Sequence, residues 1–433
     1  MGPKLHKKSF DLGVVGAFSE VINAGVKQLA LSAPLPPDEM DNFIEDAKKI
    51  AAKHNVLVYR ESDLIVTDLF PADIAKGLDV LLLFQGTTKD NYLMLKEDQK
   101  LLKDTAQYNE KNRRMISKRF GRMLSYSPQK INGLLSMNTP FKTMINFGLK
   151  ANNLFLYYDD LKKAGEFYVK NLGFELMADY KMAQIMRMTK DSYLILVDGA
   201  KGMHTTEEPK TVALALLTDQ LKEWYEHLKS KNVKIKDDFK EKENSAHDGF
   251  IVVDPEGYLL EFERFNQHQE NERFFPLLNQ NKEVVVQSAH ESDVPAELSI
   301  HSTIIWLYYK DVLAMQHFYE DVYGFEEVVD QGWTKIYRVS ETGFMAIVDE
   351  KRGMHKFTDQ KAVNVGFILD DIEGWFKYVK KNSLFDLKDH ELHIEKESRY
   401  KAFVGYGPEK YFIEFDKFFP HQDNTRLLKY LME

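Results

Sequence analysis

Two arginines and two glutamates occupy equivalent positions in two similar stretches of the chain. Arg187 and Arg338 lie in short runs typical of β-strands, where a guanidinium can bind a carboxylate or phosphate through two parallel hydrogen bonds. Glu261 and Glu414 lie in later apolar runs, where a buried carboxyl group would have a raised pKa and could act as a general base. The simpler alternatives are an arginine on the outer face of a sheet and a salt bridge between the two residue types.

Two histidines also recur at equivalent places. His204 and His355 each follow a Val-Asp pair and a short loop that contains glycine. An imidazole titrates near neutral pH, so it can transfer a proton or bind a ligand. The simpler alternative is a structural role shared by both stretches, such as a hydrogen bond that closes the loop.

These pairs belong to a long internal duplication. Similar residues recur 151 positions apart, and the spacing becomes 153 near the end of each copy. A register held over this length indicates a duplicated structural unit. The clearest pairs are Tyr157-Tyr158 with Tyr308-Tyr309, Phe167-Tyr168 with Phe318-Tyr319, Gly202-Met203-His204 with Gly353-Met354-His355, and Glu261-Phe262 with Glu414-Phe415.

Each copy is predicted to contain a strand, a helix and three strands, twice over. In the first copy, Asp160 is suited to cap the first helix and Gly173 to end it. Aliphatic and aromatic runs bounded by turn residues predict the strands. The strands are expected at 154–158, 174–180, 183–189, 192–198, 212–217, 233–236, 249–253 and 258–263, and the helices at 161–171 and 221–231.

Residues 1–140 do not share this pattern and resemble no family that we recognise. They predict a small α/β unit followed by a helical arm. Five basic residues in the arm form either a solvated helix face or a site for phosphate or nucleic acid: Arg113, Arg114, Lys118, Arg119 and Arg122. Helices are expected at 10–23, 38–54, 88–106 and 110–126, and strands at 28–32, 56–59, 64–66 and 80–84.

The duplicated unit resembles the glyoxalase/bleomycin-resistance/extradiol-dioxygenase (vicinal oxygen chelate) superfamily. The opening signature of that family reads here as Asp160-Leu161, Phe167-Tyr168 and Leu172-Gly173-Phe174. Its closing signature reads as Asp254-Pro255-Glu256-Gly257 before a strand that holds Glu261, although the second copy has Gly407-Pro408-Glu409-Lys410 in that turn. The resemblance implies paired βαβββ modules whose sheets curl into cups that hold a metal or a ligand.

Together, the duplication and the resemblance predict an α+β chain with two tandem vicinal-oxygen-chelate domains after a small α/β domain with a helical arm. The expected boundaries are 1–140 for the N-terminal region, 148–264 for the first domain, 265–297 for a polar linker, 298–420 for the second domain and 421–433 for a C-terminal tail.

The resemblance also locates three metal-ligand positions in each copy. In the first copy they fall on Asn153, Ala213 and Glu261, and in the second on Ile304, Asn364 and Glu414. Iron and zinc need several nitrogen, oxygen or sulfur ligands converging on one point, so no cofactor is expected. The alternatives are a weakly bound divalent ion and a strand bulge that brings in an off-position histidine, His301 or His247.

Other side chains are expected to line the cups. Tyr157, Trp306 and Tyr308 share the strand face of the metal positions and suit a flat or apolar ligand, unless they are ordinary core residues. Asn153 and Asn364 are further ligand-binding candidates. His247 and its counterpart Tyr400 precede a strand near the cup mouth, where either could transfer a proton. We expect Arg187 to share a cavity with Glu261, and Arg338 with Glu414.

Composition excludes some classes of function. The chain has 433 residues and no cysteine, which rules out disulfides, thiolate metal sites and thiol nucleophiles. The net charge of −9 argues against non-specific nucleic-acid binding, and no apolar run is long enough to span a membrane. We therefore expect a cytoplasmic protein whose partner is a small molecule. The sequence does not indicate its oligomeric state.

Three functions are compatible with these observations. The first is an enzyme on a small organic molecule, either a metal-dependent dioxygenase or lyase that uses off-position histidines or an isomerase that uses an acid–base group. The second is a protein that binds or sequesters a ligand, as the resistance proteins of the family do. The third is a structural protein whose cups are filled by side chains. An open, lined cup would separate the first two from the third.

Overall fold

The computed structural model describes residues 7–242 and 244–431. The chain divides between Lys142 and Thr143 into two compact units, and each is described by itself. No helix within the described residues is long and apolar enough to cross a membrane.

The N-terminal unit is a three-stranded antiparallel sheet in the order β1-β3-β2, with helices on both faces. The central strand β3 is apolar and buried throughout; Leu81 and Leu83 pack against α1 and α2, whereas Leu82 and Phe84 pack against α3, α4 and α5. The elements are α1 (Lys7–Asn23), β1 (Leu29–Leu31), α2 (Pro37–Ala52), β2 (Leu57–Glu61), β3 (Val80–Phe84), α3 (Thr88–Asp104), α4 (Glu110–Met123) and α5 (Pro128–Asn138).

Two sequence-based expectations for this unit have a clear outcome. The strand expected at 64–66 does not form, and the backbone N–H of Ile65 instead donates to the Tyr92 hydroxyl at 3.1 Å. In the basic cluster of the arm, Arg113 pairs with Asp68, Arg114 with Glu110 and Arg119 with Asp98. Carboxylates of the same unit therefore pair with most of these positive charges, as is typical of a solvated helix face.

The C-terminal unit contains four βαβββ modules, so the predicted α+β class is confirmed. Asp160 caps α6 by accepting from the Lys163 backbone N–H, and Gly173 ends it with φ +75°, both as predicted. The modules are β4 (Leu149–Tyr158), α6 (Leu161–Leu172), β5 (Glu175–Asp179), β6 (Ala183–Thr189), β7 (Ser192–Asp198); β8 (Val212–Leu217), α7 (Leu221–Ser230), β9 (Lys234–Asp237), β10 (His247–Val253), β11 (Leu259–Phe265); β12 (Ser302–Tyr309), α9 (Val312–Phe318), β13 (Glu326–Asp330), β14 (Thr334–Arg338), β15 (Gly343–Asp349); and β16 (Val363–Leu369), α10 (Ile372–Asn382), β17 (Asp386–Leu387), β18 (His393–Ile394), β19 (Tyr400–Tyr406), β20 (Phe412–Phe418).

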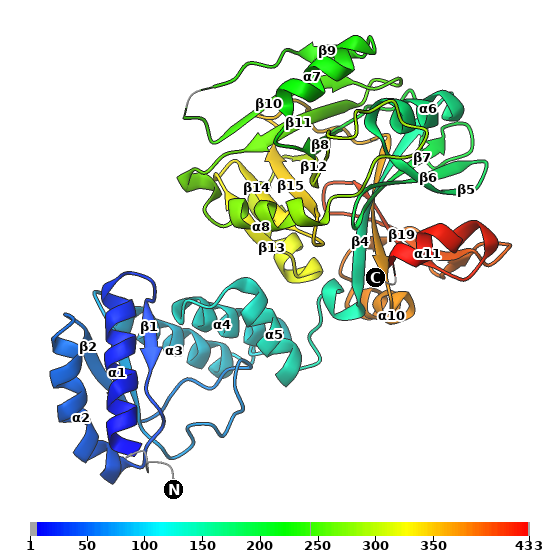
Figure 1. Ribbon diagram of the computed structural model, residues 1–433. Helices are drawn as coiled ribbons and strands as arrows, with labels where there is room; N and C mark the ends of the chain where they lie inside the picture. The colour runs from blue at the N-terminus through cyan, green and yellow to red at the C-terminus, as the bar shows by residue number, and fades with distance from the viewer. Residues whose placement is uncertain (1–6, 243, 432–433) are drawn as a thin grey trace, which may run out of the picture. The chain divides into compact units, whose positions relative to one another are not determined.

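The modules do not pair within each copy, so that expectation was wrong. The second and third modules form one eight-stranded sheet through β8 and β12, and the first and fourth form a nine-stranded sheet through β4 and β16. Figure 1 shows β8 and β11 of the first copy beside β12 and β15 of the second. We call the curved inner face of the nine-stranded sheet the first cup and that of the eight-stranded sheet the second cup.

Hydrogen bonds between the copies stabilise this exchange. The Tyr258 hydroxyl accepts from the Tyr157 backbone N–H at 3.0 Å and donates to the Ala362 carbonyl at 2.7 Å. Its counterpart Tyr411 accepts from the Tyr308 backbone N–H at 2.9 Å and donates to the Thr211 carbonyl of the first copy at 2.8 Å. The modules present similar first-strand edges, and these two tyrosine hydrogen bonds join the copies in the observed pairing.

A short helix follows the last strand of each copy and packs into a cup. α8 (Phe274–Asn281) contributes Phe274 and Leu278 to the second cup, and α11 (Thr425–Leu431) contributes Leu427 to the first. Each helix follows a turn that begins with His-Gln, and in these turns the imidazoles of His268 and His421 accept a backbone N–H two residues later. Short helical turns complete the unit: η1 (Met144–Phe147), η2 (Gln269–Asn271), η3 (Lys282–Val284), η4 (Tyr319–Tyr323) and η5 (Gln422–Asn424).

Candidate functional site

A pair of carboxyl groups lies in the second cup. Glu261 and Glu263 are two residues apart on β11, so both point to the same face of the sheet. Glu261 stands across from Ala215 on β8, which in turn faces Ile304 on β12. These neighbours carry no polar side-chain atom, so the two glutamates are the polar centre of this part of the cup.

The carboxyl pair borders an open cavity of about 180 Å³. Trp306 and Tyr308 from β12 form part of its wall, and Trp333 stands beside Arg352, whose guanidinium lies 4.4 Å from the ring centroid. The remaining wall is mainly apolar and comes from Phe265, Val329, Ile336, Val348 and Met354. The volume suits one aromatic ring with a small substituent, since cavities for drug-sized ligands are larger.

The electrostatics of this cavity favour a proton or another cation. Burial raises the pKa of Glu263 to about 7. Side-chain hydrogen bonds with Trp306 and Glu261 partly offset this increase in pKa. Burial, and then the charge of Glu263, raise the pKa of Glu261 well above its usual range. Trp306 acts on Glu263 as a hydrogen-bond donor, and within the described residues neither Glu263 Oε2 nor Trp306 Nε1 has another hydrogen-bond partner.

The first cup contains the equivalent carboxyl pair, Glu414 and Asp416 on β20. Burial raises the pKa of Glu414 to about 7 and that of Asp416 well above its usual range. Asn364 Nδ2 donates to Glu414 at 2.8 Å, and Asn153 Nδ2 donates to Asp416 at 3.2 Å. The first cup thus brings together Asn153, Asn364 and Glu414, which the sequence analysis had assigned to different copies.

Aromatic side chains cover the carboxyl pair of the first cup. Tyr400 stacks on Tyr180 with ring centroids 5.9 Å apart, and the Arg399 guanidinium lies 4.4 Å from the Tyr180 ring centroid. The second cup has His247 and Gln331 at the positions equivalent to Tyr400 and Tyr180, and both line its cavity. This exchange of two tyrosines for smaller polar residues accounts for the open space in the second cup.

The predicted pairs of arginine and glutamate are not formed. Arg187 and Arg338 lie in different sheets from Glu261 and Glu414, respectively, because the modules pair across the copies. Arg187 donates to the Lys190 carbonyl at 3.2 and 3.3 Å, and Arg338 Nε donates to the Ser340 carbonyl at 3.2 Å. Each arginine therefore stabilises the hairpin turn that follows its own strand. Neither arginine borders the cavity of the second cup.

The recurring histidines lie against the cup tyrosines. His204 makes an edge contact with Tyr157 and its Nδ1 lies 2.6 Å from Glu208 Oε2, while His355 makes an edge contact with Tyr308. Burial lowers the pKa of both histidines, and that of His355 reaches about 4.

Among the described residues, neither off-position histidine belongs to a group of three possible metal ligands. His301 lies beside the Ser302 hydroxyl at 3.1 Å, and burial lowers its pKa to about 4. His247 lines the cavity mouth beside Phe265, with ring centroids 5.9 Å apart.

Sequence reasoning missed Glu263 and Asp416. The signal was present, because Glu261-Phe262-Glu263 and Glu414-Phe415-Asp416 alternate with period two on a strand and recur at the same spacing. It also missed the recurring turns that begin at His268 and His421. In those turns Asn271 and Asn424 are fully buried, and each donates to two backbone carbonyls.

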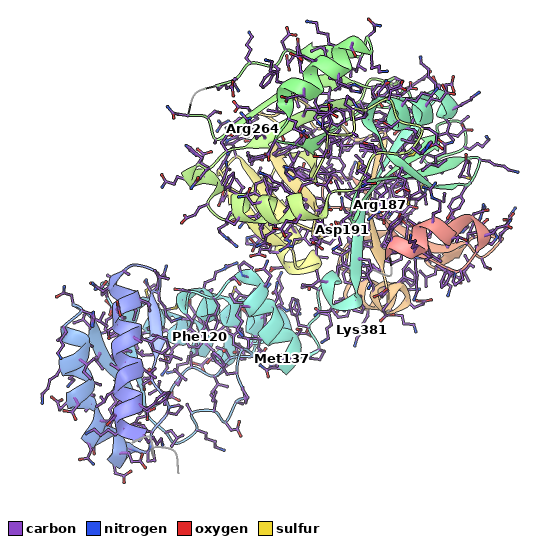
Figure 2. The ribbon with its side chains drawn as sticks, in the orientation of Figure 1. Phe120, Met137, Arg187, Asp191, Arg264 and Lys381 are labelled. Atoms are coloured by element: carbon purple, nitrogen blue, oxygen red, sulfur yellow. The ribbon has the colours of Figure 1, made fainter. Side chains whose placement is uncertain are left out.

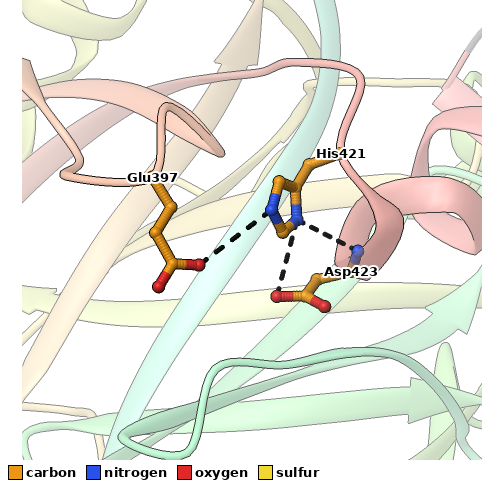
Figure 3. A group of neighbouring side chains, drawn as sticks. All are labelled: Glu397, His421 and Asp423. Carbon is orange, nitrogen blue, oxygen red and sulfur yellow. Dashed lines mark hydrogen bonds and ion pairs between the residues drawn. The ribbon is translucent and has the colours of Figure 1, made fainter.

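One group of three possible metal-ligating side chains occurs in the part of the chain that the structure describes: Glu397, His421 and Asp423 (Figure 3). His421 Nδ1 accepts the Asp423 backbone N–H at 3.1 Å, so this lone pair is already used. Arg399 lies 3.1 Å from Asp423 and 3.8 Å from Glu397. The group is therefore an ion-pair network that holds η5, not an open ligand set.

Comparison with known proteins identifies the class of the duplicated unit. Residues 150–262 match the family model of the Glyoxalase/Bleomycin resistance protein/Dioxygenase superfamily. This region therefore belongs to that superfamily, as its motifs predicted, and the second copy repeats those motifs. No curated protein sequence matches the chain.

Similar solved structures include two proteins from a plant and a bacterium. Glyoxalase I from Zea mays has a TM-score of 0.44 and 14% identity, covering 66% of this chain and 95% of that one. A putative dioxygenase from Bacillus subtilis subsp. subtilis str. 168 has a TM-score of 0.43 and 14% identity, covering 67% of this chain and 91% of that one.

Proposed function

We propose that the protein binds a small, flat organic molecule with a cationic nitrogen in the second cup. The observation that carries this proposal is the carboxyl pair Glu261 and Glu263 at the wall of an aromatic-lined cavity. A cation placed between the two carboxylates would replace the proton that they otherwise retain, and it would gain charge-assisted hydrogen bonds. The ring of the same ligand would lie against Trp306 and Tyr308.

The metal chemistry of the superfamily does not fit the side chains of either cup. In the second cup the expected positions hold Ile304, Ala213 and Glu261, which offer a single ligand group. In the first cup the amide nitrogens of Asn153 and Asn364 point at the carboxylates and satisfy them with N–H donors. A metal ion needs lone pairs at that point. We therefore propose a function without iron or zinc in either cup.

Benzamidine and benzamide provide a matched test, because they have similar shape and differ in charge. We expect benzamidine to bind about tenfold more tightly than benzamide in a calorimetric titration at pH 8, since hydrogen bonds to charged groups contribute about 1.5–3 kcal/mol. Glu263→Gln should abolish this preference. Asp416→Asn, the equivalent change in the tyrosine-covered first cup, should leave it intact. Equal binding of the two ligands would overturn the proposal.

Acid–base catalysis is a second candidate, favoured by the pKa of about 7 at Glu263. A carboxyl group with this pKa is suited to take a proton from carbon next to a carbonyl and return it to a neighbouring position. Acetylacetone in D₂O tests the chemistry, because its methylene hydrogens exchange when a base removes them. Catalysed exchange that Glu263→Gln removes and Asp416→Asn retains would support an isomerase; exchange at the uncatalysed rate would exclude this probe reaction.

A further inference from the structure

A second cavity lies outside both cups. It has a volume of about 740 Å³, is open to solvent on one side, and is lined by residues of β5, β6, the hairpin after β6, the segment 284–291 and α11. Its walls combine apolar side chains, among them Val169, Leu176 and Val285, with the guanidinium of Arg187. Figure 2 marks Arg187 between the strands of the first module and α11. The cavity is in the range that accommodates a drug-sized molecule.

Arg187 is an unusual cation in this setting. Its side chain is 93% buried, yet within residues 7–242 and 244–431 no carboxylate forms an ion pair with it. It donates from Nε and Nη2 to one backbone carbonyl, and its guanidinium lies 3.8 Å from the centroid of the Tyr430 ring. Burying a cation without a counter-charge is costly, so the site favours an anion.

Two other cations that line the cavity are already paired. Lys190 binds Glu341 at 2.6 Å, and Arg426 binds Glu175. His290 and Glu291 also line the cavity, and both are exposed to solvent. The buried cation without an ion-pair partner in the described lining is therefore Arg187, whose single charge favours a monoanion over a phosphate. Tyr430 fixes the plane of the guanidinium and prepares it for a planar carboxylate.

The second copy shows which features are specific to this cavity. The ion pair between Arg426 and Glu175 recurs there as Arg273 with Glu326, at 3.0 Å, so that pair holds the helix in both copies. Arg338 occupies the position of Arg187 but is more exposed. Leu277 occupies the position of Tyr430. The buried guanidinium stacked on a tyrosine is therefore specific to the Arg187 cavity, whereas the ion pair that positions the helix is common to both copies.

The segment 284–291 forms a defined wall of the cavity. The Ala289 backbone N–H donates to the Gly173 carbonyl at 2.9 Å, and the Asp293 backbone N–H donates to the Lys170 carbonyl at 2.9 Å. A Cβ atom at Gly173 would lie 2.6 Å from the Ser288 hydroxyl, so the close approach of this segment requires glycine there. The two hydrogen bonds place the apolar residues Val284, Val285 and Val286 along the cavity.

We propose that this cavity binds an organic monocarboxylate with an apolar body. The carboxylate would accept from Arg187 in the plane that Tyr430 sets, and the acyl chain or ring would lie along the valines of the 284–286 segment. This site is independent of the second cup, because Arg187 and Glu263 belong to different sheets.

Hexanoate, 1-hexanol and inorganic phosphate are the probes for a calorimetric titration of the full chain at constant ionic strength. We expect hexanoate to bind at one site, at least tenfold more tightly than either hexanol or phosphate. Arg187→Gln should lower the affinity for hexanoate at least tenfold, and Tyr430→Leu should lower it several-fold. The matched variant Arg338→Gln should change this affinity less than twofold, and so should Glu263→Gln in the second cup.

Several results would overturn this site. Equal binding of hexanol would show a merely apolar cavity, and equal or tighter binding of phosphate would show a different anion preference. No hexanoate binding, or unchanged binding in Arg187→Gln, would also refute it. If Arg187→Gln fails to fold, Arg187→Lys retains the charge but loses the planar fork, and it should still weaken hexanoate more than Arg338→Gln does.

Discussion

Replacing Glu263 with glutamine should change how the stability of the protein depends on pH. Burial moves the pKa of this carboxyl group from the ordinary 4.5 to about 7 in the folded state. The folded chain then binds more protons than the unfolded chain between these values, so its stability falls as the pH rises from about 4.5 through 7. The full cost is about 3 kcal/mol, since one pKa unit corresponds to about 1.4 kcal/mol.

Glutamine cannot ionise, so Glu263→Gln removes this cost. Urea unfolding of both proteins between pH 5 and pH 8 measures the effect. The variant should gain stability relative to the wild type as the pH rises, by up to about 3 kcal/mol at pH 8. Glu223→Gln, at an exposed position on α7, is the control for a general charge effect. Parallel pH profiles for the wild type and Glu263→Gln would refute the assignment of a buried, protonated carboxyl group.

Four further outcomes are expected. Trp306→Ala should lower the affinity for benzamidine about tenfold in the calorimetric titration, because the ligand loses a stacking surface. Phe274→Ala should lower the free energy of unfolding by about 3–5 kcal/mol, because this fully buried ring of α8 fills one end of the second cup. Tyr258→Phe should cost about 1–3 kcal/mol in urea unfolding, since the Ala362 carbonyl and Tyr157 N–H lose their partner. Elemental analysis of the purified protein should find iron and zinc well below one per chain.

Local sequence patterns were sufficient to predict the modules but not their partners. Asp160 and Gly173 mark the ends of α6 through the backbone conformations that they favour, and the structure confirms both. In contrast, the edge of β4 fits β8 and β16 equally well on strand pattern, because the copies are related by duplication. The partner depends on contacts between residues far apart in the chain, such as Asn153 with Asp416.

The candidate site could be predicted in part for the same reason. Glu261 was assigned to a cup from the family resemblance, and Trp306 and Tyr308 were assigned from strand alternation relative to such positions; all three line the open cavity. The sequence did not reveal which cup is open, since this depends on how Tyr180 and Tyr400 stack across two modules. The buried position of Arg187 could not be predicted from the sequence either, because its partner Tyr430 comes from a helix at the far end of the chain.

The most direct test of the central claim is the pH dependence of benzamidine binding to the second cup. Benzamidine stays cationic over the range, whereas the Glu261 and Glu263 pair loses a proton near pH 7. Its affinity measured by calorimetry should therefore rise about tenfold from pH 6 to pH 8 and be independent of pH in Glu263→Gln. An affinity that does not change with pH in the wild type, or that changes equally in Glu263→Gln, would contradict the proposed role of the carboxyl pair.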